Sequence, residues 1–148
     1  MDSSAAIENT KPFPCPDVAY FPVNPALAGN KELASQVFRI VGEKSKALVL
    51  TGYASGSIPD QLNPFITELK QKGIPTFVLS SNFGEDSGSH RTNYDVHHKT
   101  AEAGTILLQK PNINRGEEVI KAVQELINEG KTGDELIKAV VKKYGTAA

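Results

Sequence analysis

The sequence predicts a three-layer α/β fold of the Rossmann-like or flavodoxin-like class, with helices on both faces of a mostly parallel sheet of about four strands. Two observations favour this class. Short apolar runs alternate with longer amphipathic segments, which indicates strands joined through right-handed helical crossovers. The run Lys46–Thr51 is apolar between a charged residue and a glycine, as expected of a strand covered on both faces.

Four segments have the composition of strands. The first, 18–23, is limited by two prolines, and the second, 46–51, is the expected central strand. Segments 75–80 and 103–109 follow. The chain shows no internal repeat, and its 148 residues suffice for one domain that folds without metal or disulfide.

Four helices are expected between and after these strands. The first follows the N-cap Asn30, the second spans about 59–72, the third spans about 114–128, and the last begins near Thr132. Thr132 and Glu135 have the spacing of a capping box. Helical spacing selects the residues that should face the core. They are Leu33, Val37, Ile40 and Val41; Leu62, Ile66 and Leu69; Val119, Ile120, Val123, Leu126 and Ile127; and Leu136, Ile137, Val140 and Tyr144.

The first residues differ in composition from the rest. Residues 1–16 are small, polar and rich in proline, so we expect a flexible tail followed by one domain at 17–148. Cys15 lies in this tail without a second cysteine, and we interpret it as an incidental thiol. The start of the chain has neither a basic segment nor an apolar core, and no run approaches a membrane span. A cytoplasmic location is expected.

Charge and motifs narrow the classes of partner. With 16 basic and 17 acidic residues, the chain has no field that would attract nucleic acid or an anionic membrane. His90, His97 and His98 lack the spacing of a metal site, because adjacent histidines point to different faces. Neither a dinucleotide fingerprint nor a Walker loop is present. We therefore expect no metal and no cofactor.

Two polar loops are expected at the carboxyl ends of the strands, where such sheets bind ligands at a reversal of strand order. Residues 52–57 are small and lead into a helix, so their backbone amides could face a carboxylate; the alternative is a tight turn. Residues 80–95 are dense in hydroxyls, amides and carboxylates. They line a polar site or form a solvated surface loop.

A hydrolase that acts alone needs a hydroxyl nucleophile, a base and an orienting group. Ser55 precedes Gly56, but the chain has no Gly-x-Ser-x-Gly elbow. His90 lies near Asp86 and Asp95 in sequence. These residue types permit a serine hydrolase, but their arrangement does not support one.

From Lys46 onward the order of features resembles a known family. The segments are Lys46-Ala-Leu-Val-Leu-Thr-Gly-Tyr-Ala-Ser-Gly-Ser-Ile-Pro59, a helix, Lys72-Gly-Ile-Pro-Thr-Phe-Val-Leu-Ser-Ser81, and Ala103-Gly-Thr105 before a further helix. In this order they resemble the C-terminal domain of the bacterial-type L-asparaginases and glutaminases. The resemblance covers residues 17–144 and implies a similar α/β domain.

The resemblance also implies where catalysis would occur. Enzymes of this family hydrolyse the side-chain amide of L-asparagine or L-glutamine with threonine nucleophiles of an N-terminal domain, which we expect to be absent from this chain. Their C-terminal domain builds the dimer interface and lends an asparagine and an acidic residue to the neighbouring subunit's site. Carried onto this sequence, the asparagine falls at Ser57, after Ser55 and Gly56, and the acidic residue at Asp95. A hydroxyl thus replaces the amide.

The sequence leaves three hypotheses open. The leading one is a stand-alone asparaginase C-terminal-like module that is not catalytic alone. It would act through association, as a homo-oligomer or with a protein partner that completes an L-asparagine amidohydrolase. The second is a domain that binds an amino acid or carboxylate through Ser55, Gly56, Ser57 and Asp95. The third is a serine or threonine hydrolase in its own right.

Overall fold

A computed structural model of the chain describes residues 15–52, 58–79, 101–108 and 116–145. In this part of the chain one sheet has the order β1-β2-β3-β4, and every neighbouring pair is parallel. The strands are β1 (Val18–Pro22), β2 (Ala47–Thr51), β3 (Thr76–Leu79) and β4 (Thr105–Leu107). The predicted parallel sheet is confirmed.

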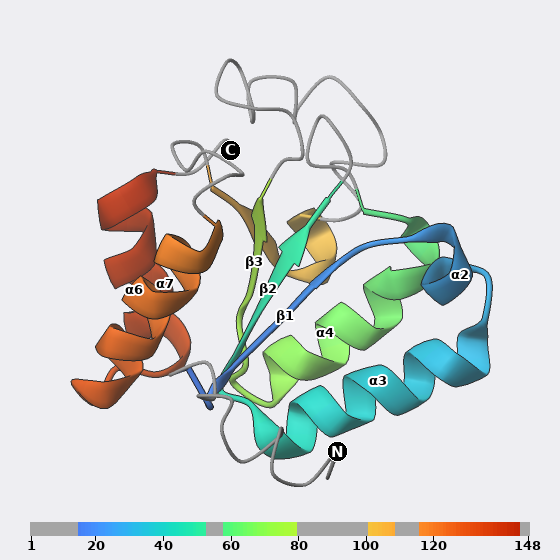
Figure 1. The fold of residues 1–148 in the computed structure, drawn as a ribbon, viewed down its shortest axis with the longest axis horizontal. Coiled ribbons are helices and arrows are strands. Elements are labelled where there is room, and N and C mark those ends of the chain that lie inside the picture. Colours follow the sequence, from blue (N-terminus) through green and yellow to red (C-terminus); the bar gives the residue numbers. More distant parts are fainter. Residues whose placement is uncertain (1–14, 53–57, 80–100, 109–115, 146–148) are drawn as a thin grey trace, which may run out of the picture.

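Helices cover both faces of the sheet, which gives three layers (Figure 1). Apolar side chains of α3 and α4 pack on one face, and those of α6 and α7 pack on the other. The predicted fold class is therefore confirmed. The helices are α2 (Pro25–Ala28), α3 (Lys31–Lys44), the short 3-10 helix η1 (Asp60–Leu62), α4 (Asn63–Gln71), α6 (Gly116–Asn128) and α7 (Gly133–Tyr144).

Strand β2 lies between β1 and β3, and all of its residues are buried. Leu48 and Leu50 face α3 and α4, whereas Ala47 and Val49 face α6 and α7. Successive side chains of a strand point to opposite faces, so a strand between two helical layers must be apolar throughout. The predicted central position of this strand is confirmed.

Helix α3 begins where the sequence predicts it, but it buries a different face. The Asn30 side chain accepts a hydrogen bond from the backbone N–H of Leu33 (3.0 Å), as an N-cap does. The predicted core positions Leu33 and Ile40, however, are 42% and 53% exposed. The prediction is wrong for these two residues.

Aromatic contacts explain the orientation of α3. Phe38 is buried, stacks on Phe65 with ring centroids 5.3 Å apart, and meets Phe21 edge-on at 5.9 Å. Ala34, one turn earlier, is also buried. Both sides of α3 carry apolar side chains, so periodicity alone could not choose between them. The ring contacts with β1 and α4 select the side with Phe38.

The predicted helix at 59–72 is present as η1 followed by α4. Leu62, Ile66 and Leu69 are buried, as predicted from their spacing. The chain leaves the helix through Gly73, whose φ of 79° lies in the left-handed region that glycine adopts without strain.

Strand β4 begins later than predicted. Residues 101–103 are helical, and β4 starts at Thr105. Between them Gly104 has a φ of 120°, and a Cβ built on it would lie 2.7 Å from Cδ of Lys70. Ala103, predicted as strand, is buried on the α3 and α4 side. The tight turn at Gly104, which brings the chain against α4, ends the helical segment and delays the strand.

Helix α7 begins after Thr132, as predicted, but the expected capping box does not form. The Thr132 side chain makes no capping hydrogen bond. The backbone N–H of Glu135 donates to the Thr132 carbonyl instead (3.2 Å), so this donor is already satisfied. The predicted core residues of α6 and α7 lie in or against the core. Val119, Ile120, Val123, Ile127, Leu136 and Val140 are buried, and Leu126, Ile137 and Tyr144 are partly buried.

Cys15 belongs to the core rather than to a tail. Its side chain is 6% exposed and packs in the apolar cluster formed with α6 and α7. Burial is the main cause that raises the pKa of the thiol; Lys121 lowers it, whereas Glu117 and Glu125 raise it further. A buried, neutral thiol is a poor nucleophile. This agrees with the interpretation of Cys15 as a non-catalytic residue, although its predicted position in a tail is wrong.

Candidate functional site

The carboxyl edge of the sheet is where the sequence places a ligand site, but the expected reversal of strand order is not found there. The described strands follow one another across the sheet in the order in which they occur in the chain. Each connection places the next strand on the same side of the strand before it. Two neighbouring connections therefore do not run in opposite directions across the described sheet, and no crevice of a switch point forms between them. The loops after β2 and β3 instead leave from adjacent strands.

The residues expected to contact a ligand lie outside the described residues; they are Ser55, Gly56, Ser57 and Asp95. His90, His97 and His98 also lie outside them. The structure does show where the two candidate loops leave the sheet. The backbone N–H of Gly52 donates to the carbonyl of Leu79 (2.7 Å), so the loops 52–57 and 80–95 start from hydrogen-bonded neighbours.

The far end of the first loop is also fixed. Ile58 has no exposed surface and packs in the core between the sheet and the α3 and α4 layer. Residues 53–57 therefore connect two anchored positions, Gly52 at the sheet edge and Ile58 in the core.

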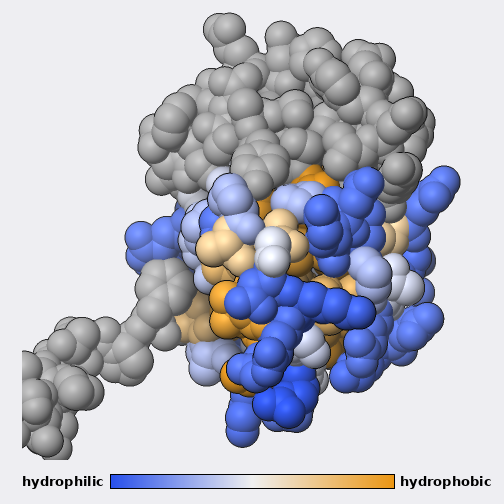
Figure 2. All heavy atoms as spheres, turned by 90° about the vertical axis from the view of Figure 1, so that its right-hand side faces the viewer, coloured by the Kyte–Doolittle hydropathy of each residue, from blue (hydrophilic) through white to orange (hydrophobic). Residues whose placement is uncertain are grey.

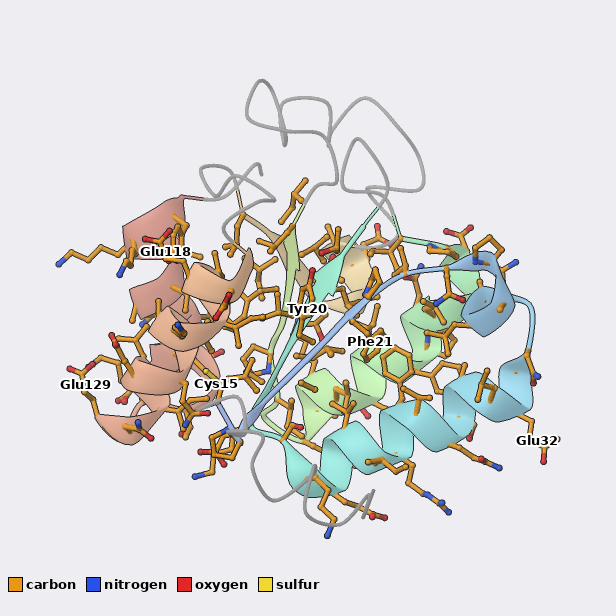
Figure 3. All side chains as sticks on the ribbon, viewed as in Figure 1. Cys15, Tyr20, Phe21, Glu32, Glu118 and Glu129 are labelled. Atoms are coloured by element: carbon orange, nitrogen blue, oxygen red, sulfur yellow. The ribbon has the colours of Figure 1, made fainter. Side chains whose placement is uncertain are left out.

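Two hydroxyl groups at this edge were not identified from the sequence. The side-chain oxygens of Tyr20 on β1 and Thr51 at the end of β2 share a hydrogen bond of 2.7 Å. Tyr20 is 42% exposed, whereas Thr51 is buried. Figure 3 shows Tyr20 and Phe21 on opposite sides of β1, with Phe21 toward α3 and α4. Parallel pairing of Tyr20 with Val49 could have revealed the pair, because Thr51 lies two residues farther on the same face.

The N-terminal end of α6 lies against this edge. A Cβ built on Gly116, its first residue, would lie 3.6 Å from Cδ1 of Leu79 and 3.7 Å from the hydroxyl oxygen of Tyr20. Glu117 and Glu118 follow in the first turn, where carboxylates complement the partial positive charge of a helix end. This end of α6 is therefore a close neighbour of the hydroxyl pair and not a ready site for an anion.

The arrangement suits the positioning of a polar group better than nucleophilic catalysis. Tyr20 and Thr51 are hydrogen-bonded to each other, whereas a hydroxyl nucleophile needs an adjacent base. In the described ranges no group of three His, Cys, Asp or Glu side chains could hold a metal ion. Nor does any helix of those ranges have the length and apolar character to cross a membrane.

No protein-family model matches this chain, and no curated protein sequence matches it. A solved structure does: "The thermostable L-asparaginase from Thermococcus kodakarensis" matches with a TM-score of 0.64 and 25% sequence identity. The match covers 85% of this chain and 34% of that enzyme. The chain is similar to part of an L-asparaginase.

This similarity supports the coarser part of the resemblance stated from the sequence. The α/β architecture and the likeness to an L-asparaginase agree with it. The chain spans about a third of that enzyme's length, because the match covers 34% of it. Any activity of the whole enzyme is therefore a separate question from the fold of this domain.

Proposed function

We propose that this chain is an asparaginase C-terminal-like module that acts through association and is not catalytic alone. In this proposal another polypeptide segment carries the threonine nucleophile for L-asparagine hydrolysis, and this domain forms part of the surroundings of that site. The observation that carries the proposal is the partial match, which covers 85% of this chain and 34% of an L-asparaginase.

The chemistry of the carboxyl edge supports this proposal. Its described hydroxyls, Tyr20 and Thr51, share a hydrogen bond with each other, whereas a hydroxyl nucleophile bonds to a base. The loop between the anchored residues Gly52 and Ile58 contains Ser57, at the position where the family's asparagine falls. A hydroxyl there can still donate a hydrogen bond to a substrate bound in a neighbouring site.

Ammonia release tests whether the chain is catalytic alone. Purified chain is incubated with L-asparagine and, separately, with L-glutamine, and the Thermococcus kodakarensis enzyme serves as the positive control. We expect no ammonia above the buffer background. Sustained turnover that Ser55→Ala or Ser57→Ala abolishes would contradict the proposal and favour a hydrolase in its own right.

A chimera tests the positive half of the proposal. This chain replaces the matching third of the Thermococcus kodakarensis enzyme, and circular dichroism confirms that the chimera folds. We expect weak hydrolysis of L-asparagine, and a higher rate after Ser57→Asn restores the family's amide. A folded chimera that is inactive both with Ser57 and after Ser57→Asn would count against the proposal.

A second candidate function is the binding of a free amino acid or carboxylate at the carboxyl edge. It is favoured by Tyr20, which is 42% exposed and whose hydroxyl bonds to Thr51, the residue before the loop origin Gly52. A ligand that binds only the folded state must raise the unfolding midpoint. Thermal unfolding with L-asparagine, L-aspartate and L-glutamine, and with nucleotides as controls, tests this. Unchanged midpoints with all three amino acids would rule the candidate out.

A further inference from the structure

Helix α3 carries an apolar stripe that the described fold leaves uncovered. Leu33 and Ile40 are 42% and 53% exposed, and Val37 between them is partly buried. With about 3.6 residues per turn, these three positions fall on one side of the helix. Figure 2 views the molecule from the right-hand side of Figure 1 and shows apolar residues at the surface among charged ones. Exposed apolar side chains grouped on one helix are typical of an interaction surface.

The stripe points away from the neighbouring helix. A Cβ built on Gly42 would lie 3.3 Å from Nζ of Lys72 and 3.5 Å from Cδ2 of Leu69, so Gly42 faces α4. Residue 42 lies about half a turn around the helix from Leu33 and Ile40. The stripe therefore occupies the side of α3 opposite to α4.

Charged residues flank the stripe in a self-complementary pattern. Glu32 and Arg39 are exposed, and they are separated by seven residues, as Leu33 and Ile40 are. Seven residues make almost two turns, so each pair lies along one line of the helix. Among the described residues no salt bridge engages Glu32 or Arg39. Figure 3 shows Glu32 extending away from the fold at the start of α3.

Antiparallel packing of two copies of α3 satisfies both patterns together. A twofold axis near Gln36 places Leu33 of each copy against Ile40 of the other. The same axis places Glu32 of each copy near Arg39 of the other, with opposite charges. A parallel arrangement would instead place the flank that carries Glu32 and Arg39 on opposite sides of the contact in the two copies, so that neither residue would meet its opposite charge.

We infer that α3 is a surface through which two copies of this chain associate in antiparallel orientation, with Leu33, Val37 and Ile40 at its centre. The partner that binds this surface is a second copy of the chain. The reason is that α3 itself supplies both the acidic and the basic residue of each charge pair, as a twofold interface requires. The inference rests on the proposed function through association and assigns it a surface. A contact confined to one helix is small for a stable complex, so the dimer dissociates on dilution.

Sedimentation velocity over a concentration series tests this surface. The full chain is expected to change from monomer to dimer as its concentration rises, and added salt should weaken the dimer. Arg39→Glu and Glu32→Arg should each raise the dissociation constant roughly tenfold, because every changed pair occurs twice in the interface. The double variant should restore most of the affinity, and Lys138→Glu on the opposite helical layer should have no effect.

The outcomes separate this inference from the proposed function. A monomer at all concentrations overturns the inference, and so does a dimer that the α3 variants do not change. A charge-swapped double variant that remains as weak as the single variants also overturns it. These results leave the proposed function in place, since that proposal fails on ammonia release by the chain alone. Circular dichroism of each variant shows that the fold is retained.

Discussion

Asp17 and Gln124, 107 residues apart in the sequence, join the start of β1 to α6 through two hydrogen bonds. The backbone N–H of Asp17 donates to Oε1 of Gln124 (2.9 Å), and Nε2 of Gln124 donates to Oδ2 of Asp17 (2.8 Å). The same Nε2 also donates to Oδ1 of Asn128 (3.1 Å). Gln124 is buried, so these bonds replace those that its amide would make with water.

Replacement of Gln124 by alanine should therefore destabilise the fold. The substitution leaves the N–H of Asp17 without its acceptor in a partly buried position, and we expect a loss of about 1–3 kcal/mol. Unfolding in urea measures the difference in free energy. Glu125→Ala, at the exposed next position of α6, is the matched control and should change little. Equal effects of the two substitutions would show that the network contributes nothing.

The orientation of α3 predicts unequal effects for two of its apolar residues. Phe38→Ala removes a buried ring that contacts Phe21 and Phe65, and it should cost about 3–5 kcal/mol. Ile40→Ala on the exposed side should have a much smaller effect on the stability of the monomer. Urea unfolding at a concentration too low for association separates the two. A larger loss for Ile40→Ala would mean that α3 buries the other face.

Removal of the Tyr20 hydroxyl and removal of the Tyr144 hydroxyl should have different effects on the stability of the fold. Tyr20→Phe deletes a hydrogen bond to Thr51 and should destabilise the fold by about 0.5–1.5 kcal/mol. The hydroxyl of Tyr144 is buried without a hydrogen-bond partner among the described residues. Tyr144→Phe should thus be neutral or stabilising, because it removes an unsatisfied polar group. Thermal unfolding of both variants tests the contrast, and destabilisation by Tyr144→Phe alone would reverse it.

Burial of Cys15 predicts a loss of stability at alkaline pH. Desolvation raises the pKa of the thiol in the folded state, so the unfolded thiol ionises first as pH increases. The contribution is complete below the unfolded pKa and is lost as pH rises through the folded pKa. Urea unfolding between about pH 7 and pH 10 should show a steeper decline for the natural chain than for Cys15→Ala.

The comparison with Cys15→Ala is needed because burial also raises the pKa of Tyr144, with further contributions from Glu118 and Glu125. Ionisation of Tyr144 therefore also lowers the stability at alkaline pH, equally in the natural chain and in Cys15→Ala. Identical pH profiles for the natural chain and Cys15→Ala would mean that the thiol ionises equally easily in both states. Slow alkylation of Cys15 by iodoacetamide near neutral pH, and rapid alkylation in urea, provide an independent measurement.

Part of the candidate site could be predicted from the sequence, and part could not. The carboxyl edge followed from the alternation of strands and helices, and the loops at 52–57 and 80–95 followed from their composition. The Tyr20 and Thr51 pair depends on the parallel register of β1 with β2, which composition does not reveal. The proposed ligand contacts Ser55, Gly56, Ser57 and Asp95 remain predictions.

The sequence by itself determined the order of the elements, the parallel sheet and the buried central strand, because these follow from patterns among neighbouring residues. Only the tertiary structure decided which side of α3 is buried, that Cys15 joins the core, and that Asp17 meets Gln124. The physical reason is that each of these depends on contacts between segments distant in the chain. Local periodicity limits the possible faces of an element, and packing against its neighbours selects one.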